Sequence, residues 1–354
     1  MLNKNIYNEI ISKKDFKSEL LDMSKIEMKT TREGFGDALL ALGTEHNEVV
    51  ALCADLTDSV QMHKFKNAFP DRFFEMGVAE QNMASVASGM SAMGKIPFIA
   101  SYAMFNPGRN WEQIRTTICY NDRKVIIIGA HSGLSVGPDG GTHQALEDMA
   151  IMRVIPNITI FSPCDYYEAY NMTKLAYNVK GPVYIRLTRE KSQVIYNEDK
   201  IKLQSISINN TKVGAGEIIF SSLIESQYKV GIVATGPIIF EALLAAKDLE
   251  AENIKVSILN VSTIKSDNFD INQVLNFAKN NNKKIITLEE HQVTGGLGSL
   301  ICEILAEHYP SQVIRMGVQN RFGQSGTPAE LYKEYNIDRE SIKNKIRELV
   351  HSHI

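Results

Sequence analysis

The feature that most constrains the fold is a regular alternation between short apolar runs and longer segments with helical periodicity. A helical pattern over residues 31–43 ends at Gly43 and is followed by the apolar run 49–56, which has the profile of a buried parallel strand. The further expected strands are 73–78, 96–103, 124–130, 157–163 and 182–187. The expected helices between them are 80–94, 111–120 and 166–178. This alternation predicts a parallel sheet wrapped by helices, an α/β fold.

A second alternation of the same kind begins at residue 228, after a polar stretch at 190–214. Its expected strands are 228–236, 255–261 and 283–290, and its expected helices are 238–252, 271–281 and 299–309. The chain is therefore expected to form two doubly wound α/β domains. The expected limits are an N-terminal helical arm at 1–27, a first domain at 28–195, a linker at 196–227 and a second domain at 228–354.

Charge and hydropathy exclude two classes of partner. Lys and Arg number 38 while Asp and Glu number 41, so the net charge is −3 and gives no global attraction for nucleic acid or anionic lipid. The longest apolar runs, such as Val125 to Ile128, fall far short of the roughly 18 residues needed to cross a bilayer. We therefore expect neither nucleic acid nor a membrane as a partner.

The N-terminal residues and the cysteines indicate the compartment. Residues 1–27 mix charged with apolar side chains and lack the apolar core of a secretory signal. The four cysteines are far apart, without metal-ligand spacing: Cys53, Cys119, Cys164 and Cys302. They predict neither a zinc site nor a disulfide framework, which favours a reducing, cytoplasmic location.

Glu80 stands where an expected strand meets an expected helix, and small residues follow it between Ala84 and Ser91. Such a helix face allows another backbone to approach closely. A Glu in the first turn of a helix is also stabilised by the helix dipole, without any further role. This motif alone leaves a functional and a purely structural explanation open.

Three further groups of residues could carry chemistry. A glycine-rich loop with His131 and His143 follows an expected strand at its carboxyl end, where α/β proteins bind ligands, although a turn-rich connection with incidental histidines has the same pattern. Tyr102 and Phe105 follow another strand and could equally be core aromatics. The last group consists of polar residues near the edges of expected elements, where solvated surface is the ordinary explanation. They are Arg32, Asp55, Ser59 and Arg189.

The order of these segments resembles one known family. Residues 30–190 contain, in succession, TREGFGDALLALG, CADLTDS, GVAEQNM, SYAMF, EQIR, GAHSGLSVGPDGGTHQALED and MRVIPNITIFSPCD, and this succession resembles the pyrimidine-binding domain of transketolase. Farther on, EEHQVTGGLGS and RFGQSG are similar to segments of the transketolase C-terminal domain. The resemblance implies the C-terminal subunit of a split transketolase. Such an enzyme uses thiamine diphosphate as the electron sink for transfer of a two-carbon ketol unit from a ketose to an aldose.

The resemblance implies that Glu80 contacts the aminopyrimidine ring of the cofactor and is catalytic. A buried carboxyl group there can exchange a proton with the ring nitrogen, whereas Gln could only hydrogen-bond and Asp would be about one methylene too short. Tyr102 and Phe105 match aromatics that line the aminopyrimidine pocket. Asp55 and Leu56 match an Asp-Leu pair beside the cofactor.

Six residues fall on family positions that hold the sugar. The positions near its terminal phosphate are Arg32, Ser59, His131 and Arg189. Asp139 and His143 correspond to positions nearer the sugar hydroxyls. Arginine forks suit a tetrahedral oxyanion, but a sulfonate would satisfy the same donors as a phosphate. The two histidines are candidates for proton transfer, and the sequence does not divide that role between them.

Two positions depart from the family pattern. Gly108 stands where the family has a third aromatic of the pyrimidine pocket. Pro138 stands where the family commonly has Glu, immediately before Asp139. The shape of the pocket and one contact of the loop are therefore expected to differ.

The printed sequence contains no Gly-Asp-Gly motif, which in the family is followed by an Asn and holds a divalent metal on the diphosphate. A diphosphate needs a metal with carboxylate and substrate-oxygen ligands, so we expect no metal site in this chain. The resemblance implies that a partner, the N-terminal transketolase subunit, binds Mg²⁺ or another divalent cation. Two copies of each chain are expected to form an α2β2 heterotetramer, paired through the helix after Glu80.

Two other functions fit part of the pattern. The beta subunit of the decarboxylase component of a 2-oxo-acid dehydrogenase complex shares the two-domain layout and also lacks the metal motif. Its oxo-acid substrates carry no distal phosphate, however, and would not need Arg32 and the glycine-rich loop with His131 and His143. A non-catalytic partner with the same fold is the second alternative. The retained Glu80, both histidines and both arginines argue against it, because an inactive scaffold has no need of a carboxyl group in a dry pocket.

Overall fold

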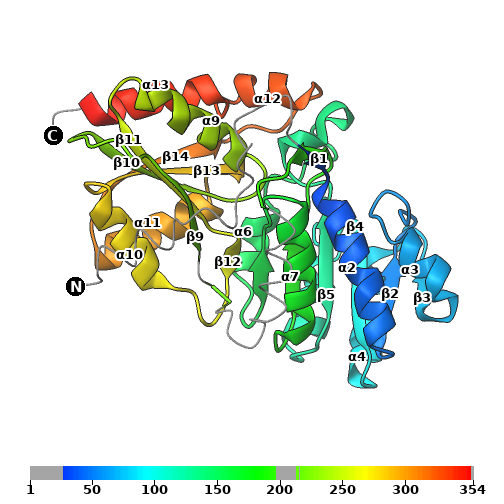
Figure 1. Cartoon of the computed structure of the whole chain (residues 1–354). Helices are drawn as coiled ribbons and strands as arrows, with labels where there is room; N and C mark the ends of the chain where they lie inside the picture. The colour runs from blue at the N-terminus through cyan, green and yellow to red at the C-terminus, as the bar shows by residue number, and fades with distance from the viewer. Residues whose placement is uncertain (1–26, 197–212, 215, 352–354) are drawn as a thin grey trace.

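The computed structural model describes residues 27–196, 213–214 and 216–351, so the arm expected at 1–27 lies almost wholly outside the described residues. The described residues form two α/β halves side by side, each built around its own sheet (Figure 1). The first sheet has seven strands and the second has five, and both are mainly parallel. The predicted α/β class, with two doubly wound units, is confirmed.

The first sheet has the strand order β12-β6-β7-β5-β4-β2-β3, in which every strand except β12 is parallel to its neighbours. Apolar residues of these strands are buried on both faces, as expected for a sheet covered by helices. The six strands predicted from the sequence are β2 (Val49–Cys53), β3 (Phe73–Glu75), β4 (Ile96–Tyr102), β5 (Ile126–Ala130), β6 (Thr159–Phe161) and β7 (Val183–Arg186).

Helices cover both faces of the first sheet. On one face α2 (Thr31–Glu45) and α7 (Tyr166–Asn178) pack their apolar stripes against alternate strand residues. The opposite face carries α4 (Glu80–Ala92), the π-helical turn η2 (Ile114–Cys119) and α6 (Asp148–Arg153). The helix expected at 111–120 is therefore split, because α5 (Trp111–Gln113) continues into the wider π turn.

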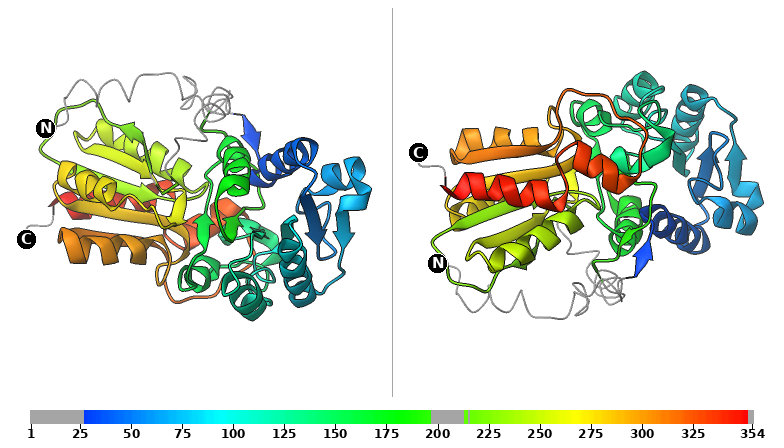
Figure 2. Two further views of the ribbon diagram at one scale, coloured as in Figure 1. Left: turned by 90° about the horizontal axis from the view of Figure 1, so that it is seen from below. Right: turned by 90° about the horizontal axis from the view of Figure 1, so that it is seen from above.

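The second sheet has the order β14-β13-β10-β11-β9, with β9 antiparallel to β11. Its strands are β9 (Glu217–Ser221), β10 (Lys229–Ala234), β11 (Lys255–Asn260), β13 (Lys284–Gln292) and β14 (Gln312–Val318). The helices that cover one face are α9 (Ile239–Glu250) and α13 (Arg339–His351), and those that cover the other are α10 (Ile271–Asn280) and α11 (Leu297–His308). Figure 2 shows this sandwich from below and from above.

Several elements differ from the sequence-based expectation. Strand β9 falls inside the range 196–227 expected to be a linker, so the second sheet begins before residue 228. Its short antiparallel edge position explains why the repeating pattern did not include it. Strand β14 and the helices α12 (Pro328–Glu334) and α13 follow the last element expected from the sequence.

Strand β12 (Thr263–Lys265) belongs to the second alternation in sequence but joins the edge of the first sheet, antiparallel to β6. Its Lys265 ammonium donates to the carbonyl oxygens of Arg153 (2.8 Å) and Ile155. In addition, the amide of Ser162 donates to the carbonyl of Ser262 (2.7 Å). The chain thus returns to the first half after entering the second.

The remaining short elements belong to the first half. Strand β1 (Met28–Lys29) pairs with β8 (Ser192–Gln193), which brings the start of α2 beside the segment after β7. The other short helices are α3 (His63–Ala68), η1 (Pro70–Arg72) and η3 (Leu134–Asp139).

Candidate active site

Most of the predicted site residues lie at the carboxyl edge of the first sheet. Asp55 follows β2, Tyr102 ends β4, and His131 follows β5. Because these strands are parallel neighbours, their ends meet at one edge, where open α/β sheets bind ligands. The start of α2 and the segment after β7 add the two predicted arginines to the same edge.

Glu80 is the first residue of α4, and only 1% of its surface is exposed. One carboxylate oxygen accepts from the hydroxyl of Ser101 (3.2 Å), and the other accepts from a guanidinium nitrogen of Arg109 (2.7 Å). The side-chain amide of Asn110 donates to the backbone carbonyl of Glu80 (3.1 Å). The helix dipole at this end also favours a negative charge. The carboxylate is thus fixed in a dry place with one partly exposed ionic partner.

Four aromatic rings gather beside Glu80. Tyr102 stacks on His131 with ring centroids 3.7 Å apart, and Phe105 meets His143 edge to face at 5.7 Å. The guanidinium of Arg109 lies over the Phe105 ring, 4.6 Å from its centroid. Flat, partly exposed ring faces therefore stand next to a buried carboxylate, an arrangement that suits a flat heterocycle with hydrogen-bonding nitrogens.

The glycine at position 108 is explained by steric crowding. A Cβ atom placed there would lie 2.0 Å from the carbonyl oxygen of Met104, so the backbone in this conformation leaves no room for a side chain. The third aromatic of the family cannot occupy this position without a different loop. The tight turn also brings Arg109 back over Phe105, where it reaches Glu80.

His131 is buried and adopts a left-handed backbone conformation, with φ of +53°. Burial first, and then the positive charges of Arg32 and Arg189, lower its pKa to about 2, so the ring is neutral at physiological pH. Its Nδ1 atom is buried and has no hydrogen-bond partner among the described residues. An unpaired buried nitrogen is costly, and here it can serve a ligand.

Arg32 lies at the start of α2 and is linked to Arg189. Thr30 caps α2 through a capping box with Glu33, which fixes Arg32 in the first helical turn. Arg32 donates to the backbone carbonyls of Ser59 and of Arg189 (2.5 Å for the latter). Burial lowers the pKa of Arg32, but a guanidinium stays charged at any physiological pH.

Arg189 and Asp139 extend this cation pair toward the loop. Arg189 donates to the carbonyl oxygen of Val136 (2.7 Å) and lies 3.8 Å from the carboxylate of Asp139. Both side chains are about one-third exposed. The structure thus brings Arg32, Ser59, Arg189 and Asp139 together beside the aromatic cluster.

Asp55 and Leu56 lie on the loop after β2. The backbone N–H of Asp55 donates to the carboxylate of Glu75 (2.7 Å), and its φ of +57° turns the chain sharply at the end of the strand. Asp55 is exposed, whereas Leu56 packs partly against the core below. Both stand at the predicted edge, with Asp55 turned to solvent.

Sequence reasoning missed three residues around Glu80, namely Ser101, Arg109 and Asn110. The signal available was the polar pair Arg109 and Asn110, shortly after Phe105 in the chain. The contacts of Arg109 and Asn110 with Glu80 span 29 and 30 residues, so no local pattern joins them.

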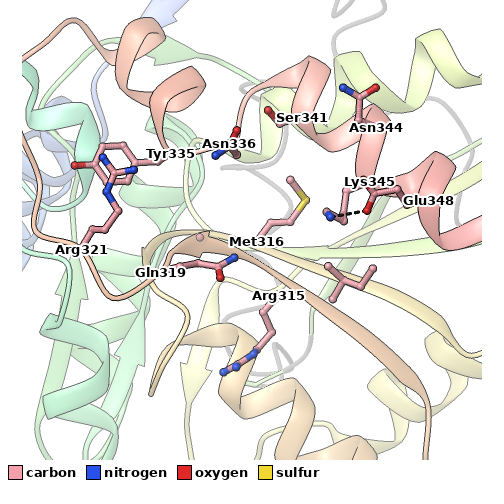
Figure 3. A pocket seen from close by; sticks show the side chains of 12 residues that line it. Arg315, Met316, Gln319, Arg321, Tyr335, Asn336, Ser341, Asn344, Lys345 and Glu348 are labelled. Carbon is pink, nitrogen blue, oxygen red and sulfur yellow. Dashed lines mark hydrogen bonds and ion pairs between the residues drawn. The ribbon is translucent and has the colours of Figure 1, made fainter.

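A cavity of about 550 Å³ lies elsewhere, between β14 and α13 in the second half (Figure 3). None of the predicted site residues lines it. Its charged groups already have partners, since Lys345 pairs with Glu348 (2.6 Å), Arg321 pairs with Glu334 (2.7 Å) and Arg315 donates to the carbonyl of Val293 (2.9 Å). Size alone therefore does not mark the site.

Neither a metal-binding cluster nor a membrane-spanning helix occurs in the described residues. They contain no group of three or more His, Cys, Asp or Glu side chains arranged to hold a metal ion. Within the same residues, no helix is long and apolar enough to span a bilayer.

Comparison with known proteins decides the family. Residues 27–194 match the family described as "Transketolase, pyrimidine binding domain", and residues 222–342 match "Transketolase, C-terminal domain". The chain belongs to the transketolase family. The pyrimidine-binding domain implies binding of thiamine diphosphate, and the geometry around Glu80 lies inside that domain.

Two relatives of this transketolase-family chain match over nearly their whole lengths. A putative transketolase C-terminal section from Methanocaldococcus jannaschii is 38% identical over 322 residues, which is 90% of this chain and 96% of the relative. The 6-deoxy-6-sulfo-D-fructose transketolase subunit SqwH from Clostridium sp. is 34% identical over 92% of this chain and 96% of the relative. By contrast, the chain spans about half the length of the mouse and human members that it matches.

A solved structure described as "Split gene transketolase, inactive beta4 tetramer" superposes with a TM-score of 0.79 at 38% identity, over 91% of this chain and 98% of that one. Together with the two relatives of similar length, it shows that this chain is homologous to a split-gene transketolase subunit.

Proposed function

We propose that this chain is the C-terminal subunit of a thiamine-diphosphate-dependent transketolase that moves a two-carbon ketol unit from a ketose phosphate or sulfonate to an aldose. The observation that carries the proposal is the buried carboxylate of Glu80 beside the stacked rings of Tyr102 and His131. This arrangement matches the chemical need of a cofactor that must be protonated and deprotonated away from water.

The residues present fit an aminopyrimidine ring. Glu80 would hold a ring nitrogen and carry the proton exchanged with it, while Phe105 and Tyr102 would bound the flat ring. Arg109, which pairs with Glu80 and covers Phe105, is 43% exposed and can turn away into solvent. When bound, the cofactor supplies the electron sink for breaking a carbon–carbon bond next to a carbonyl. Asp55 and Leu56 would border it at the end of β2.

The sugar would lie between the ring cluster and the two arginines. Arg32 and Arg189, with Ser59, would hold the distal anion, and their fork geometry accepts a phosphate or a sulfonate. Neutral His131 would bind an oxygen of the substrate through its unpaired Nδ1. Asp139 and His143 would hold hydroxyl groups and share proton transfer with His131. The name of the Clostridium relative, which specifies a sulfo-sugar, keeps the sulfonate in this proposal.

A partner subunit would supply the diphosphate half of the cofactor site. The chain carries no Gly-Asp-Gly motif and spans about half the length of the mouse and human members that it matches, so we infer an N-terminal subunit that binds Mg²⁺ or another divalent cation. The exposed side of α4 includes Ser85 and Gly89, which permit close pairing with a second copy of this chain. An α2β2 heterotetramer is the proposed assembly. The four free cysteines support a cytoplasmic location.

Reconstitution tests the proposal. The chain would be mixed with the product of a neighbouring reading frame that carries Gly-Asp-Gly, together with thiamine diphosphate and Mg²⁺. We expect ketol transfer from phosphorylated or sulfonated ketoses by the mixture and none by this chain alone. Decarboxylation of pyruvate or a branched oxo acid without ketol transfer would instead support the dehydrogenase-component alternative. Absence of turnover with every substrate would support a non-catalytic role.

The same mixture tests the assembly. Analytical ultracentrifugation should give a heterotetramer of about 130 to 140 kDa, from two chains of 39.6 kDa and two partners of ordinary two-domain size. Calorimetry on the lone chain should show weak or no binding of thiamine diphosphate. Full activity of the lone chain would contradict the split-enzyme proposal.

A further inference from the structure

The segment from His131 to His143 has an irregular backbone. His131, Gly133, Gly137 and Gly140 all have positive φ, between +53° and +82°. The short helix η3 between them is interrupted at Gly137 by a non-helical conformation. Some of the segment's backbone N–H groups bond within it, as that of Gly140 does to the carbonyl of Gly137 (3.1 Å), and others take partners from outside it. This segment, here called the histidine loop (residues 131–143), carries three of the residues proposed to bind the sugar.

The second half of the molecule supplies one of those partners from the interior of β13. The backbone N–H of Ser135 donates to one carboxylate oxygen of Glu290 (2.8 Å), and the hydroxyl of Tyr332 on α12 donates to the other (2.7 Å). Glu290 is only 2% exposed. A Cβ atom at Gly133 would lie 2.7 Å from the carboxylate oxygen that accepts from Ser135, so only glycine lets Glu290 approach the loop this closely.

A second set of contacts with the histidine loop comes from residues 323–326, which follow β14. The side-chain amide nitrogen of Gln144 donates to the carbonyls of Leu134 (3.2 Å) and Gly137 (3.3 Å) within the loop, and to that of Gln324 (3.0 Å) outside it. A Cβ atom at Gly141 would lie 2.6 Å from the carbonyl oxygen of Gly323. The loop is thus in backbone contact with the second half along much of its length.

We propose that Glu290, supported by Tyr332, is a positioning residue for the histidine loop, so that the second half of this chain sets the geometry of sugar binding without touching the sugar. The role in sugar binding rests on the proposed function. Of the contacts above, the one between the carboxylate and the Ser135 N–H is charge-assisted, which makes it the strongest single tie between the loop and the second half. Glu290 holds the middle of the loop, between His131 at one end and Asp139 and His143 at the other.

The chain offers a matched pair of variants. Glu290→Met removes both acceptors, whereas Glu290→Gln keeps an oxygen for Ser135 and can present its amide to the Tyr332 hydroxyl, which is able to accept. Glu289→Met is the control, because Glu289 is the neighbouring buried carboxylate on β13. It accepts from the backbone N–H groups of Leu297 (2.8 Å) and Gly298 (2.7 Å), both within the second half. Tyr332→Phe tests the supporting hydroxyl.

Hydrogen exchange on the full chain is the first readout, because it needs neither partner nor cofactor. We expect the amides of residues 133–137 to exchange about tenfold faster or more in Glu290→Met, the change expected when one hydrogen bond to a charged group is lost. Glu290→Gln should stay near the wild type, Tyr332→Phe should show a smaller increase, and Glu289→Met should leave these amides unchanged. If the amides of residues 133–137 exchanged equally fast in Glu290→Met and Glu289→Met, the proposal would be overturned. The same holds if both variants are less stable than the wild type.

Kinetics of the reconstituted complex is the second readout. Glu290→Met should raise the KM for an anionic ketose donor about tenfold to 100-fold while kcat changes less and the affinity for thiamine diphosphate stays within about twofold. Glu290→Gln should restore most of the KM. A faster-exchanging loop with an unchanged KM would overturn the positioning role. A wild-type complex without ketol transfer would refute the proposed function, and with it the role toward the sugar, while the exchange result would still decide whether Glu290 holds the loop.

Discussion

The carboxyl edges of the two sheets carry similar residues in opposite bonding states. At the carboxyl edge of the first sheet, His131 is buried and neutral, and its Nδ1 has no partner in the described part of the chain. Near the carboxyl end of β13 in the second sheet, His291 is equally buried, and burial lowers its pKa to about 4. Its Nδ1 lies 2.7 Å from the carbonyl oxygen of Gln292, and its Nε2 can accept from the N–H of Ala150 (3.4 Å).

The carboxylates repeat this contrast. Glu80 has an ionic partner that is 43% exposed, whereas Glu289 and Glu290 are bound by backbone N–H groups and a hydroxyl that are themselves buried or half-buried. The rule that ligands bind at the carboxyl ends of parallel strands applies to both edges and so does not distinguish them. The proposed binding site at the first edge is distinguished by buried polar atoms that have no partner or a partner exposed to solvent. The second edge uses the same residue types to hold the first one in shape.

The largest expected effect comes from Glu80→Gln, which keeps the shape of the side chain and removes its proton exchange. The rate of ketol transfer in the reconstituted enzyme should fall by about 10² or more, while calorimetry should show most of the cofactor affinity retained. The matched control is Glu168→Gln, a buried first-turn glutamate of α7 that accepts from the N–H of Cys164 (2.7 Å). If Glu80→Gln turned over at nearly the wild-type rate, the first edge would be no more catalytic than the second.

Replacing Arg32 or Arg189 by Ala should mainly weaken substrates that carry a distal anion. A hydrogen bond to a charged group contributes about 1.5 to 3 kcal/mol, so kcat/KM for such a ketose should fall roughly tenfold to 150-fold. An uncharged ketose donor is the control substrate and should be much less affected. Equal losses for both donors would make the arginines structural, like the paired residues of the second edge.

The stability of the protein should depend on pH through His131. Its folded pKa of about 2 lies far below the ordinary value of 6.5, so between these values the unfolded chain binds a proton that the folded chain does not. Stability is therefore lost as the pH falls through this window, by about 1.4 kcal/mol from this residue at pH 5.5. His131→Asn, which tolerates the positive φ, should flatten that slope in denaturant titrations between pH 7.5 and 5.5. A slope identical to that of the wild type would show that the pKa of His131 does not differ between the folded and the unfolded chain.

The smallest effect on the fold is expected at Gly89, on the exposed side of α4. A Cβ atom there would meet nothing within 4 Å beyond the backbone of its own helix, so Gly89→Leu should leave the lone chain as stable as before or up to about 1 kcal/mol more stable. If α4 pairs with a second copy, the larger side chain should block that contact. Ultracentrifugation should then show a smaller species for Gly89→Leu than for the milder Gly89→Ala. An unchanged assembly would place the interface elsewhere.

The sequence predicted the α/β class, the six main strands of the first sheet and the edge on which most site residues lie, because these depend on local hydrophobic period and on strand direction. It also singled out Glu80, since its motif is contiguous. Arg109 escaped notice because its pairing with Glu80 spans 29 residues and no periodicity connects them. Glu290 escaped for the same reason on a larger scale, since 155 residues separate it from Ser135.

Short elements were the other limit of sequence reasoning. Strands β9 and β12 have five and three residues, and each joins its sheet antiparallel, outside the repeating strand-helix pattern. Gly108 illustrates a third limit. The family pattern alone does not explain why position 108 is a glycine. The structure does, because a Cβ atom there would lie 2.0 Å from the carbonyl oxygen of Met104.

Strand β12 has a consequence for how the protein can be cut and how it melts. Because residues 263–265 complete the first sheet from within the second half, a chain ended before them would leave β6 as a bare edge, open to pairing with other molecules. Neither half would be an independent folding unit, and calorimetric unfolding should show one transition rather than two. The polypeptide should therefore tolerate a break near either end far better than a break between its two sheets.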